Sequence, residues 1–440
     1  MESQVRIISY DNGEIQRFQA VRLDGWEELE LLKPMPSGQA LDCFAKIYSL
    51  YLIPAAPWLF GNLVLFRLPE DFCLPFSHES VFSPLTAAAL ALKKGVVFRS
   101  GQPRFRNPQA EALWKELESR DCVRLVRGML PITTVIPVAN AAGFLTETHP
   151  DARLRVNGSF FIMDPIDCRT VYDHVGVPFG LFVKNGIVEQ PPLFSREALL
   201  VRQDGSISVA QCDVGQLTVR IGSRTFVHGK NARFYTRPQY QYSPAGKQAL
   251  VVIGTRVEGV CQGRTAVPCS GFVLCPEEPC NVQSGDAVSY GGMEEILFGI
   301  QVGNSILRDG IPTDRFVSRF YNIRKLWTTP FPPSLYPLDF ENAKAARIAL
   351  GADPEGKPML LWAEGAAKLG HTPGIDSCGA SLADMARICR AAGMYNAVNL
   401  DGGGSAQLLI HGRRSLMLSD RSREDHAESE RPVPMGLMVR

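Results

Sequence analysis

The sequence predicts an α+β fold with mixed, largely antiparallel sheets, few helices and a Gly-rich active-site loop at a strand end. Short apolar, β-branched runs recur between residues 132 and 301, and Asn-Gly or Asp-Gly pairs that favour hairpins separate several of them. Few segments have the apolar spacing of a helix. Three glycines follow an aspartate at the end of a strand-like run near residue 400. Together these observations favour sheets as the framework and the glycines as the functional loop.

Residues 1–130 carry no catalytic signature, and we expect them to form an N-terminal region of unknown role. Within it, the segment Asn107–Arg120 is predicted to be one amphipathic helix. The apolar residues at helical spacing are Ala110, Leu113, Trp114 and Leu117.

The segment Ile47–Phe66 has no charged residue, but prolines, a glycine and an asparagine interrupt it. A membrane-spanning helix needs about 20 mostly apolar residues in continuous helix. We therefore expect no membrane span, and predict buried strands joined by a Pro-rich turn.

Residues 131–440 are expected to form the second, catalytic domain. Asn185-Gly186 and Asp204-Gly205 predict hairpin turns within it. The predicted strands are Ile132–Val138, Leu154–Val156, Gly180–Val183, Ile187–Val188, Ala198–Arg202, Ile207–Ala210, Leu217–Ile221, Ala249–Ile253, Gly271–Leu274 and Ile296–Gln301.

A helix followed by a strand is predicted directly before the glycines. Apolar residues from Leu382 to Ala392 share one helical face, Ser381 can cap the start, and Gly393 can end the helix in the left-handed conformation. The strand that follows ends at Asp401, which places the loop at a strand end.

The loop itself consists of Gly402, Gly403, Gly404 and Ser405. Glycines lack a Cβ, so their N–H groups can face an anion or a sugar hydroxyl, while Asp401 can act as base, nucleophile or hydroxyl acceptor. A wide hairpin between Ala397–Leu400 and Gln407–Ile410 explains the same residues without any ligand. The segment lacks the patterns of a Walker loop, a dinucleotide fingerprint and a Gly-x-Ser-x-Gly elbow.

Composition limits the classes of partner. With 46 basic and 45 acidic residues the net charge is +1, so no overall field attracts nucleic acid or an anionic membrane. The segment Met1–Arg6 lacks the features of a secretory signal, which favours a cytoplasmic location. The oligomeric state cannot be read from the sequence.

Eleven scattered cysteines fit a reducing compartment with buried or free thiols. Cys261, Cys269, Cys275 and Cys280 lie close together in sequence, which raises the alternative of a structural zinc site. No Cys-x-x-Cys pair occurs among them, and we predict no metal and no cofactor.

Five motifs in order resemble those of the phosphodiester glycosidase family. The first, Asn157-Gly158-Ser159-Phe160-Phe161, is similar to the family's Asn-Gly-Gly-aromatic-Phe motif, with Ser159 in place of a glycine. Beyond it come Arg347–Gly351, Gly379–Ala386, the Asn-Leu-Asp-Gly-Gly-Gly-Ser core that ends at Ser405, and Ser419-Asp420 with Arg431-Pro432. The residues Leu416-Met417-Leu418 replace the polar approach to Ser419 that is common in bacterial relatives.

The resemblance implies hydrolysis of a sugar-1-phosphodiester, similar to an N-acetylglucosamine-1-phosphodiester, in a small molecule or a polysaccharide. Such a reaction passes through an oxocarbenium-like transition state and releases an anion, so it needs a carboxylate near the sugar and cations near the phosphate. The implied catalytic residues are Asp401, Arg347 and Asn157. The implied substrate-binding residues are Gly402, Gly403, Gly404, Ser405, Ser419, Asp420, Glu430 and Arg431.

Two other functions stay open at this stage. A carbohydrate-binding protein could retain the loop without catalysis. A metal-dependent phosphodiesterase could hold a cation between Asp401 and Asp420.

Overall fold

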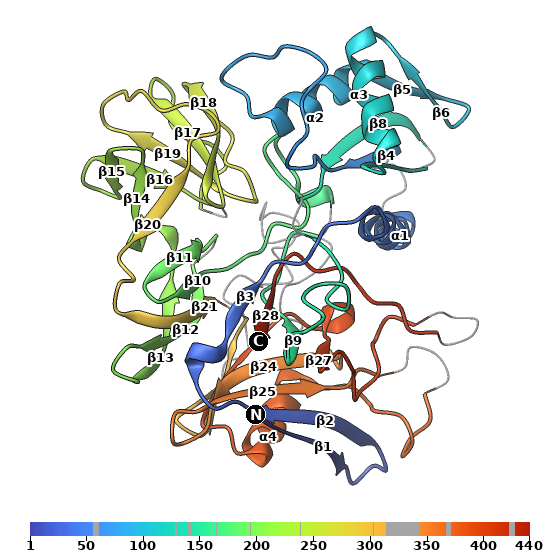
Figure 1. The fold of residues 1–440 in the computed structure, drawn as a ribbon, viewed down its shortest axis with the longest axis vertical. Helices are drawn as coiled ribbons and strands as arrows, with labels where there is room; N and C mark the ends of the chain where they lie inside the picture. The colour runs from blue at the N-terminus through green and yellow to red at the C-terminus, as the bar shows by residue number, and fades with distance from the viewer. Residues whose placement is uncertain are drawn as a thin grey trace.

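The computed structural model describes most of the chain and consists mainly of antiparallel sheets (Figure 1). The described residues are 1–55, 61–127, 130–139, 142–163, 165–193, 195–237, 239–301, 303–313, 343–366, 371–421 and 427–440. Within them are four α-helices: α1 (Gly38–Ala55), α2 (Pro84–Gly95), α3 (Pro108–Ser119) and α4 (Leu382–Ala392). The prediction of largely antiparallel sheets with few helices is confirmed.

The largest sheet combines the N-terminal hairpin with strands from the last third of the chain. Its strand order is β1 (Glu2–Ser9), β2 (Ile15–Arg22), β25 (Pro358–Ala363), β24 (Arg347–Ala352), β26 (Asn396–Asn399), β22 (Ser305–Arg308) and β23 (Ile311–Pro312). Strand β2 pairs with β25, so Phe18 lies opposite Ala363. The N-terminal hairpin therefore extends the sheet that carries the glycine loop.

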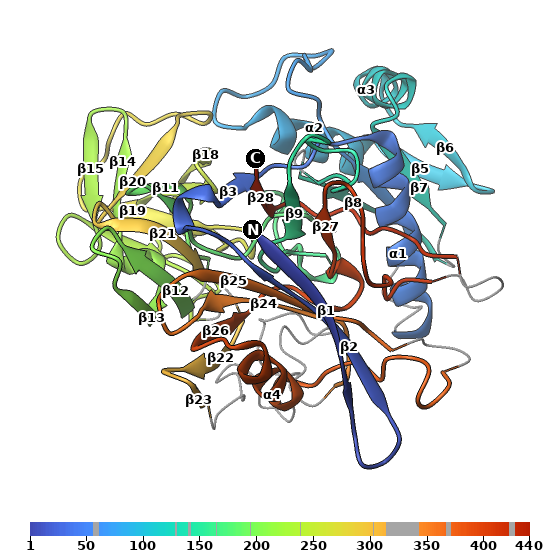
Figure 2. The same cartoon turned by 60° about the horizontal axis from the view of Figure 1, so that its bottom comes forward.

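A second sheet packs over this one. Its order is β27 (Leu408–Ile410), β9 (Leu154–Asn157), β28 (Gly436–Val439) and β3 (Glu30–Leu32). One buried cluster joins the two sheets and includes Val156, Leu408, Leu437, Leu350 and Trp362. Helix α4 covers the opposite face of the large sheet (Figure 2). Its Met385 and Ile388 are buried in one cluster with Ala349 and Leu361 of that sheet.

The middle of the chain forms three further sheets. The first contains β11 (Ile187–Gln190), β10 (Phe182–Lys184), β21 (Ile296–Gln301), β12 (Arg196–Arg202) and β13 (Ile207–Cys212). The second contains β15 (Arg224–Val227), β14 (Thr218–Ile221) and β20 (Val288–Gly291). The third contains β16 (Ala232–Tyr235), β19 (Phe272–Pro276), β17 (Gln248–Ile253) and β18 (Arg256–Gln262). Asn185 and Gly186, both at positive φ, form the predicted turn between β10 and β11.

A smaller unit lies beside them at the top of Figure 1. It contains β7 (Val123–Val126), β4 (Gly61–Phe66) and β8 (Leu130–Pro137), with the hairpin β5 (Val96–Arg99) and β6 (Gln102–Phe105). The predicted amphipathic helix is α3, with Asn107 as its N-cap and all four predicted apolar residues buried. Among the described ladders β4 with β8 is parallel, and the others are antiparallel.

Two sequence expectations change. The segment Ile47–Phe66 is half helix, because α1 continues to Ala55 before β4 begins at Gly61. Leu41, Phe44 and Ile47, three residues apart, bury one face of α1. The expectation of buried strands is therefore wrong for residues 47–55 and confirmed for β4, while residues 56–60 lie outside the described residues. Across the described residues, no helix has both the length and the apolar character that a membrane crossing requires. The boundary expected at residue 130 stays a prediction.

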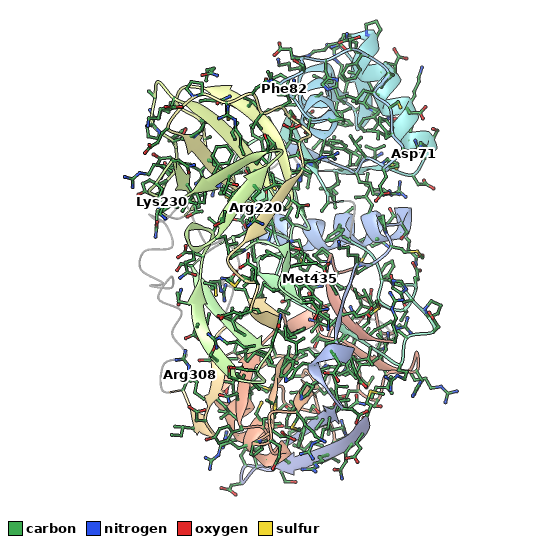
Figure 3. The ribbon with its side chains drawn as sticks, turned by 60° about the vertical axis from the view of Figure 1, so that its left-hand side comes forward. Asp71, Phe82, Arg220, Lys230, Arg308 and Met435 are labelled. Atoms are coloured by element: carbon green, nitrogen blue, oxygen red, sulfur yellow. The ribbon has the colours of Figure 1, made fainter. Side chains whose placement is uncertain are left out.

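The simple hairpin interpretation of the glycine loop is also wrong. Strand β26 pairs with β24 and β22 in the large sheet, whereas β27 pairs with β9 in the sheet above it. The glycines therefore carry the chain from one sheet to another. Met435 packs against Gly158. Figure 3 shows Met435 in the interior, with Asp71, Lys230 and Arg308 toward the periphery.

Candidate functional site

The candidate site lies where three strand ends meet. Because β24 and β26 are antiparallel, the start of β24 at Arg347 lies beside the end of β26. The Gly403 N–H donates to the Ala346 carbonyl at 2.8 Å, and the Asp401 N–H donates to the Gly158 carbonyl at 3.1 Å. The loop is thus held by the main chain on both sides, and its position does not depend on a flexible connection.

Asp401 is a carboxylate removed from water. Its side chain is 8 % exposed and accepts a hydrogen bond from the Gly402 N–H at 2.9 Å. Burial raises the pKa of Asp401 to about 6, against the opposing effects of a hydrogen bond from Ser405 and the charges of Arg431 and Arg347. A carboxylate tuned in this way is typical of a catalytic acid or base.

Asn157 holds the loop from the β9 side. Its Nδ2 donates to the Asp401 carbonyl at 2.7 Å, and its Oδ1 accepts from the Gln407 N–H at 3.0 Å. The side chain is 1 % exposed. These contacts make Asn157 a positioning residue that ties the entry and the exit of the loop together.

Arg431 and Asp420 form an ion pair next to Gly404. Arg431 Nε lies 3.0 Å, and its Nη2 2.8 Å, from Asp420 Oδ2. A Cβ at position 404 would lie 2.2 Å from that oxygen and 2.3 Å from Arg431 Nη2. Glycine is therefore required at 404 for the ion pair to approach the main chain of the loop.

The other two glycines have different constraints. A Cβ at position 402 would lie 2.7 Å from the Ala346 carbonyl oxygen, so Gly402 permits close packing on β24. Gly403 has a φ of +60° with open space around it, so the main-chain conformation is what favours glycine there.

Arg347 is a buried anchor. Its Nε donates to the Ala380 carbonyl at 3.1 Å and its Nη2 to the Ala343 carbonyl at 2.9 Å, while the side chain is 5 % exposed. It therefore connects β24 to the main chain that enters α4, and its charge acts on Asp401.

Ser419 and Glu430 lie beside this centre. The buried Ser419 hydroxyl has no hydrogen-bond partner within the described residues, and a Cβ at Gly365 would lie 2.1 Å from it. Glu430 accepts from the Thr146 N–H and hydroxyl at 3.0 and 2.6 Å. It lines a cavity of about 350 Å³ together with residues of α1, among them Asp42 and Cys43. Glu430 therefore bonds to Thr146 and faces the cavity beside α1.

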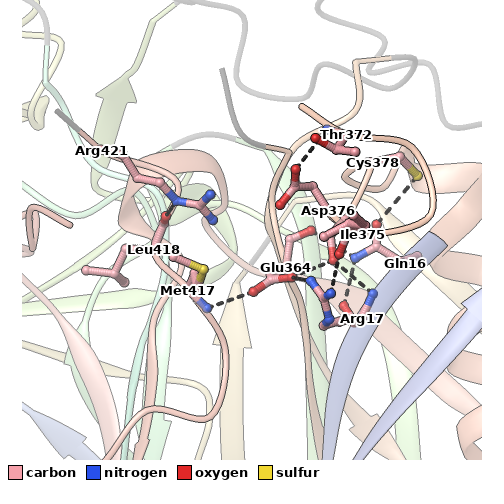
Figure 4. Close-up of polar contacts among 11 residues, drawn as sticks. Gln16, Arg17, Glu364, Thr372, Ile375, Asp376, Cys378, Met417, Leu418 and Arg421 are labelled. Atoms are coloured by element: carbon pink, nitrogen blue, oxygen red, sulfur yellow. Dashed lines mark hydrogen bonds and ion pairs between the residues drawn. The ribbon is translucent and has the colours of Figure 1, made fainter. Parts of the chain in front are cut away.

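The sequence interpretation missed Glu364, the hub shown in Figure 4. This carboxylate is 3 % exposed and accepts from Arg17 Nη1 at 3.1 Å, from the Ser377 hydroxyl at 2.5 Å and from the Met417 N–H at 2.9 Å. It joins the N-terminal hairpin to the segment that leads to Asp420. A single glutamate after an apolar strand gives no signal of such a role in the sequence.

In the described parts of the chain, no three His, Cys, Asp or Glu side chains gather closely enough to hold a metal ion. Burial raises the pKa of the Cys269 thiol well above its usual range, which favours the thiol over the thiolate that zinc binds.

Part of the chain is similar to a known family. Residues 281–440 match the family model described as phosphodiester glycosidase. That stretch contains Asp401, Arg347, Asp420 and Arg431, whereas Asn157 precedes it.

Individual relatives match over a limited length. The mouse N-acetylglucosamine-1-phosphodiester alpha-N-acetylglucosaminidase is 34 % identical over 100 residues, which is 23 % of this chain and 18 % of the mouse protein. The human protein of the same name is 32 % identical over the same length and the same shares. The match therefore spans less than a fifth of these relatives.

Solved structures are distant. The zebrafish catalytic domain of the same name, auto-inhibited by its pro-peptide, is 13 % identical with a TM-score of 0.39, covering 100 % of this chain and 82 % of that one. A hypothetical protein from Synechocystis is 15 % identical with a TM-score of 0.41, covering 100 % of this chain and 62 % of that one. At these scores the likeness carries no argument about function.

Proposed function

Because residues 281–440 match the phosphodiester glycosidase family, we propose that this chain hydrolyses a sugar-1-phosphodiester to a free sugar and a phosphomonoester. The observation that supports it best is the buried Asp401 carboxylate, held at the crossing between two sheets with the charges of two arginines acting on it. N-acetylglucosamine is the sugar named in the relatives, and we propose it as the first sugar to test.

The proposed reaction breaks the bond between the anomeric carbon and the phosphate oxygen. Water supplies a hydroxyl to the sugar, and the leaving oxygen departs on a phosphomonoester. The positive charge that develops at the anomeric carbon is stabilised by the ionised Asp401 carboxylate. Since a phosphate leaving group is already acidic, a second carboxylate that acts as general acid is not required.

Arginine charge supports the phosphate side of the proposal. Arg431 and Arg347 both act electrostatically on Asp401, so an anionic phosphate bound beside that carboxylate would lie in the same field. The Gly402 and Gly403 N–H groups already donate to Asp401 and to the Ala346 carbonyl, so what Gly402–Gly404 adds is close approach of a ligand to a main chain without side chains.

The metal-dependent alternative fits the described geometry less well. Asp420 would need to turn toward a cation shared with Asp401, but its Oδ2 contacts both Nε and Nη2 of the Arg431 guanidinium. Forming a metal site would break that ion pair and place a third positive charge beside two arginines.

The test is a hydrolysis screen that compares an N-acetylglucosamine-1-phosphodiester with the matching phosphate-free glycoside. We expect the diester to be cleaved to free sugar, with the glycoside cleaved much more slowly, and activity to persist in chelator. Asp401→Asn protein, purified in parallel, controls for contaminating hydrolases. Release of sugar 1-phosphate instead of free sugar would show phosphodiesterase chemistry and contradict the proposal.

A further inference from the structure

A second cavity lies away from Asp401, between the turn that precedes β14 and the end of β16. Its volume is about 350 Å³, within the range that holds a small ligand. In Figure 1 this region, near the labels β14 to β16, is separate from β24, β9 and β27. The lining includes Ser195, Asp213, His228, Phe234, Thr236 and Arg237.

Arg237 is the distinctive residue of this cavity. Its side chain is 7 % exposed, and its Nε donates to the Val267 carbonyl at 2.7 Å. Within the described residues its two terminal amino groups make no hydrogen bond and no ion pair. A guanidinium at the wall of a cavity, held through Nε with its terminal amino groups unengaged, can donate both of them to an anion.

His228 adds a donor to the same cavity. Its Nδ1 accepts from the Phe234 N–H at 2.9 Å, so the neutral ring carries its proton on Nε2. That ring borders the cavity beside Phe234, with ring centroids 5.3 Å apart. The site therefore offers hydrogen-bond donors next to an aromatic surface.

The acidic residue of the cavity does not neutralise Arg237. Asp213 Oδ1 accepts from the Gly215 N–H at 2.8 Å, and its Oδ2 lies 3.3 Å from the Ser195 hydroxyl oxygen. Asp213 thereby caps the short helix Val214–Gln216. Its remaining lone pairs can accept from ligand hydroxyls, a role that suits a polyol.

We propose that this cavity binds a monosaccharide-sized anion, with its carboxylate or phosphate on Arg237 and its hydroxyls toward Asp213 and His228. Arg237 would form the bidentate contact that a guanidinium makes with either group. Phe234 would provide the apolar face of the sugar-binding surface. The site is separate from the one assigned to hydrolysis, and the inference does not depend on that assignment.

Calorimetric titration with glucuronate, glucose 6-phosphate and uncharged glucose tests the proposal on the full chain. We expect at least one of the two anions to bind saturably and glucose to bind at least ~10-fold more weakly, because hydrogen bonds to charged groups are the stronger ones. Preference for one anion distinguishes a sugar acid from a sugar phosphate. Saturable binding by neither anion would overturn the proposal.

Variants assign the binding to the cavity. Arg237→Gln removes the charge but retains an amide donor for the Val267 carbonyl, and it should weaken anion binding at least ~10-fold. Arg233→Gln removes an exposed charge from the same strand, β16, and should leave the affinity unchanged. Gln239 is exposed at the rim of the cavity, and Gln239→Trp should fill the cavity and block binding. This variant is the test to use if the Arg237→Gln protein does not fold. Equal affinity in wild type and Gln239→Trp, or loss with Asp401→Asn instead, would overturn the assignment.

Discussion

At the scale of single residues, Asp401 combines high burial with a need for charge. An ionised carboxylate that is 8 % exposed is unfavourable, and its pKa of about 6 compared with 3.8 for an ordinary aspartate expresses that cost. The folded protein binds the proton more tightly than the unfolded chain does. The stability contribution of Asp401 is therefore fully present below about pH 3.8 and is lost as the pH rises through about 6.

Asp401→Asn should consequently separate activity from stability. We expect turnover to fall at least ~10²-fold because the carboxylate is lost. The free energy of unfolding at pH 7 should be no lower than in the wild type, since asparagine resembles the uncharged acid. In the wild type, kcat/KM should fall as the pH drops below about 6, because the ionised form is the active one. Turnover that survives in a folded Asp401→Asn protein would remove Asp401 from the chemistry.

Gly404 can be tested against its neighbour in the same loop. Gly404→Ala places a Cβ 2.2 Å from Asp420 Oδ2, so the Arg431 ion pair must move, and overpacking of this kind costs about 1–3 kcal/mol. We expect kcat/KM to fall ~10-fold or more. Gly403→Ala is the matched control, since it meets open space and carries only the strain of a φ of +60°. Equal kcat/KM in the two variants would mean that the ion pair does not serve the reaction.

At the scale of elements, Glu364 couples the N-terminal hairpin to the segment that carries Asp420. Glu364→Gln keeps an acceptor for the Met417 N–H but loses the acceptors for Arg17 and Ser377. Because Arg17 is 30 % exposed, we expect a loss of about 1–3 kcal/mol, below the value for a fully buried pair. The midpoint temperature of thermal unfolding and kcat should both decrease.

The exposed pair of Glu111 and Lys115 on α3 provides the comparison for Glu364. Glu111→Gln should change stability by less than about 0.5 kcal/mol and leave kcat unchanged. A destabilised Glu364→Gln protein with full kcat would show that the Glu364 hub supports the fold but does not position the loop.

The elements divide clearly into those that local sequence determines and those that it does not. Helix α4 was predictable from its capping box at Ser381 and from Gly393 at positive φ, since both signals are local. The hairpin interpretation of the glycine loop failed because β26 pairs with β24 and β27 pairs with β9, and both partners are far away in the sequence. Glu364 was missed for the same reason: Arg17 and Ser377 become its neighbours only after folding.

The site residues show the same limit. Sequence motifs indicated Asp401, Arg347 and Arg431 as one group, and electrostatic contact with Asp401 joins them in the structure. The Asn157 side chain forms its hydrogen bonds with the main chain of the loop. An Asn-Gly pair in the sequence does not predict those contacts. The roles of these residues in catalysis stay predictions.

At the scale of the whole molecule, the part that matches the family is not a self-contained unit. Strand β9 lies between β27 and β28, and β2 lies beside β25, yet β9 and β2 come from outside residues 281–440. A fragment of residues 281–440 should therefore fail to unfold cooperatively and should show no hydrolysis, as judged by circular dichroism and the diester assay. A cooperative, active fragment would show that the pairing with β2 and β9 is dispensable.

The pairing of Phe18 with Ala363 joins residues that are far apart in the sequence. Contacts between residues so far apart in sequence require a large loop to close before they contribute any stability, and high contact order slows folding. Local hairpins such as β10 with β11 need no such closure. The main chain of Asp401 bonds to Gly158 and Asn157, which are also far away in the sequence, so we expect the raised pKa of this carboxylate to appear late in refolding.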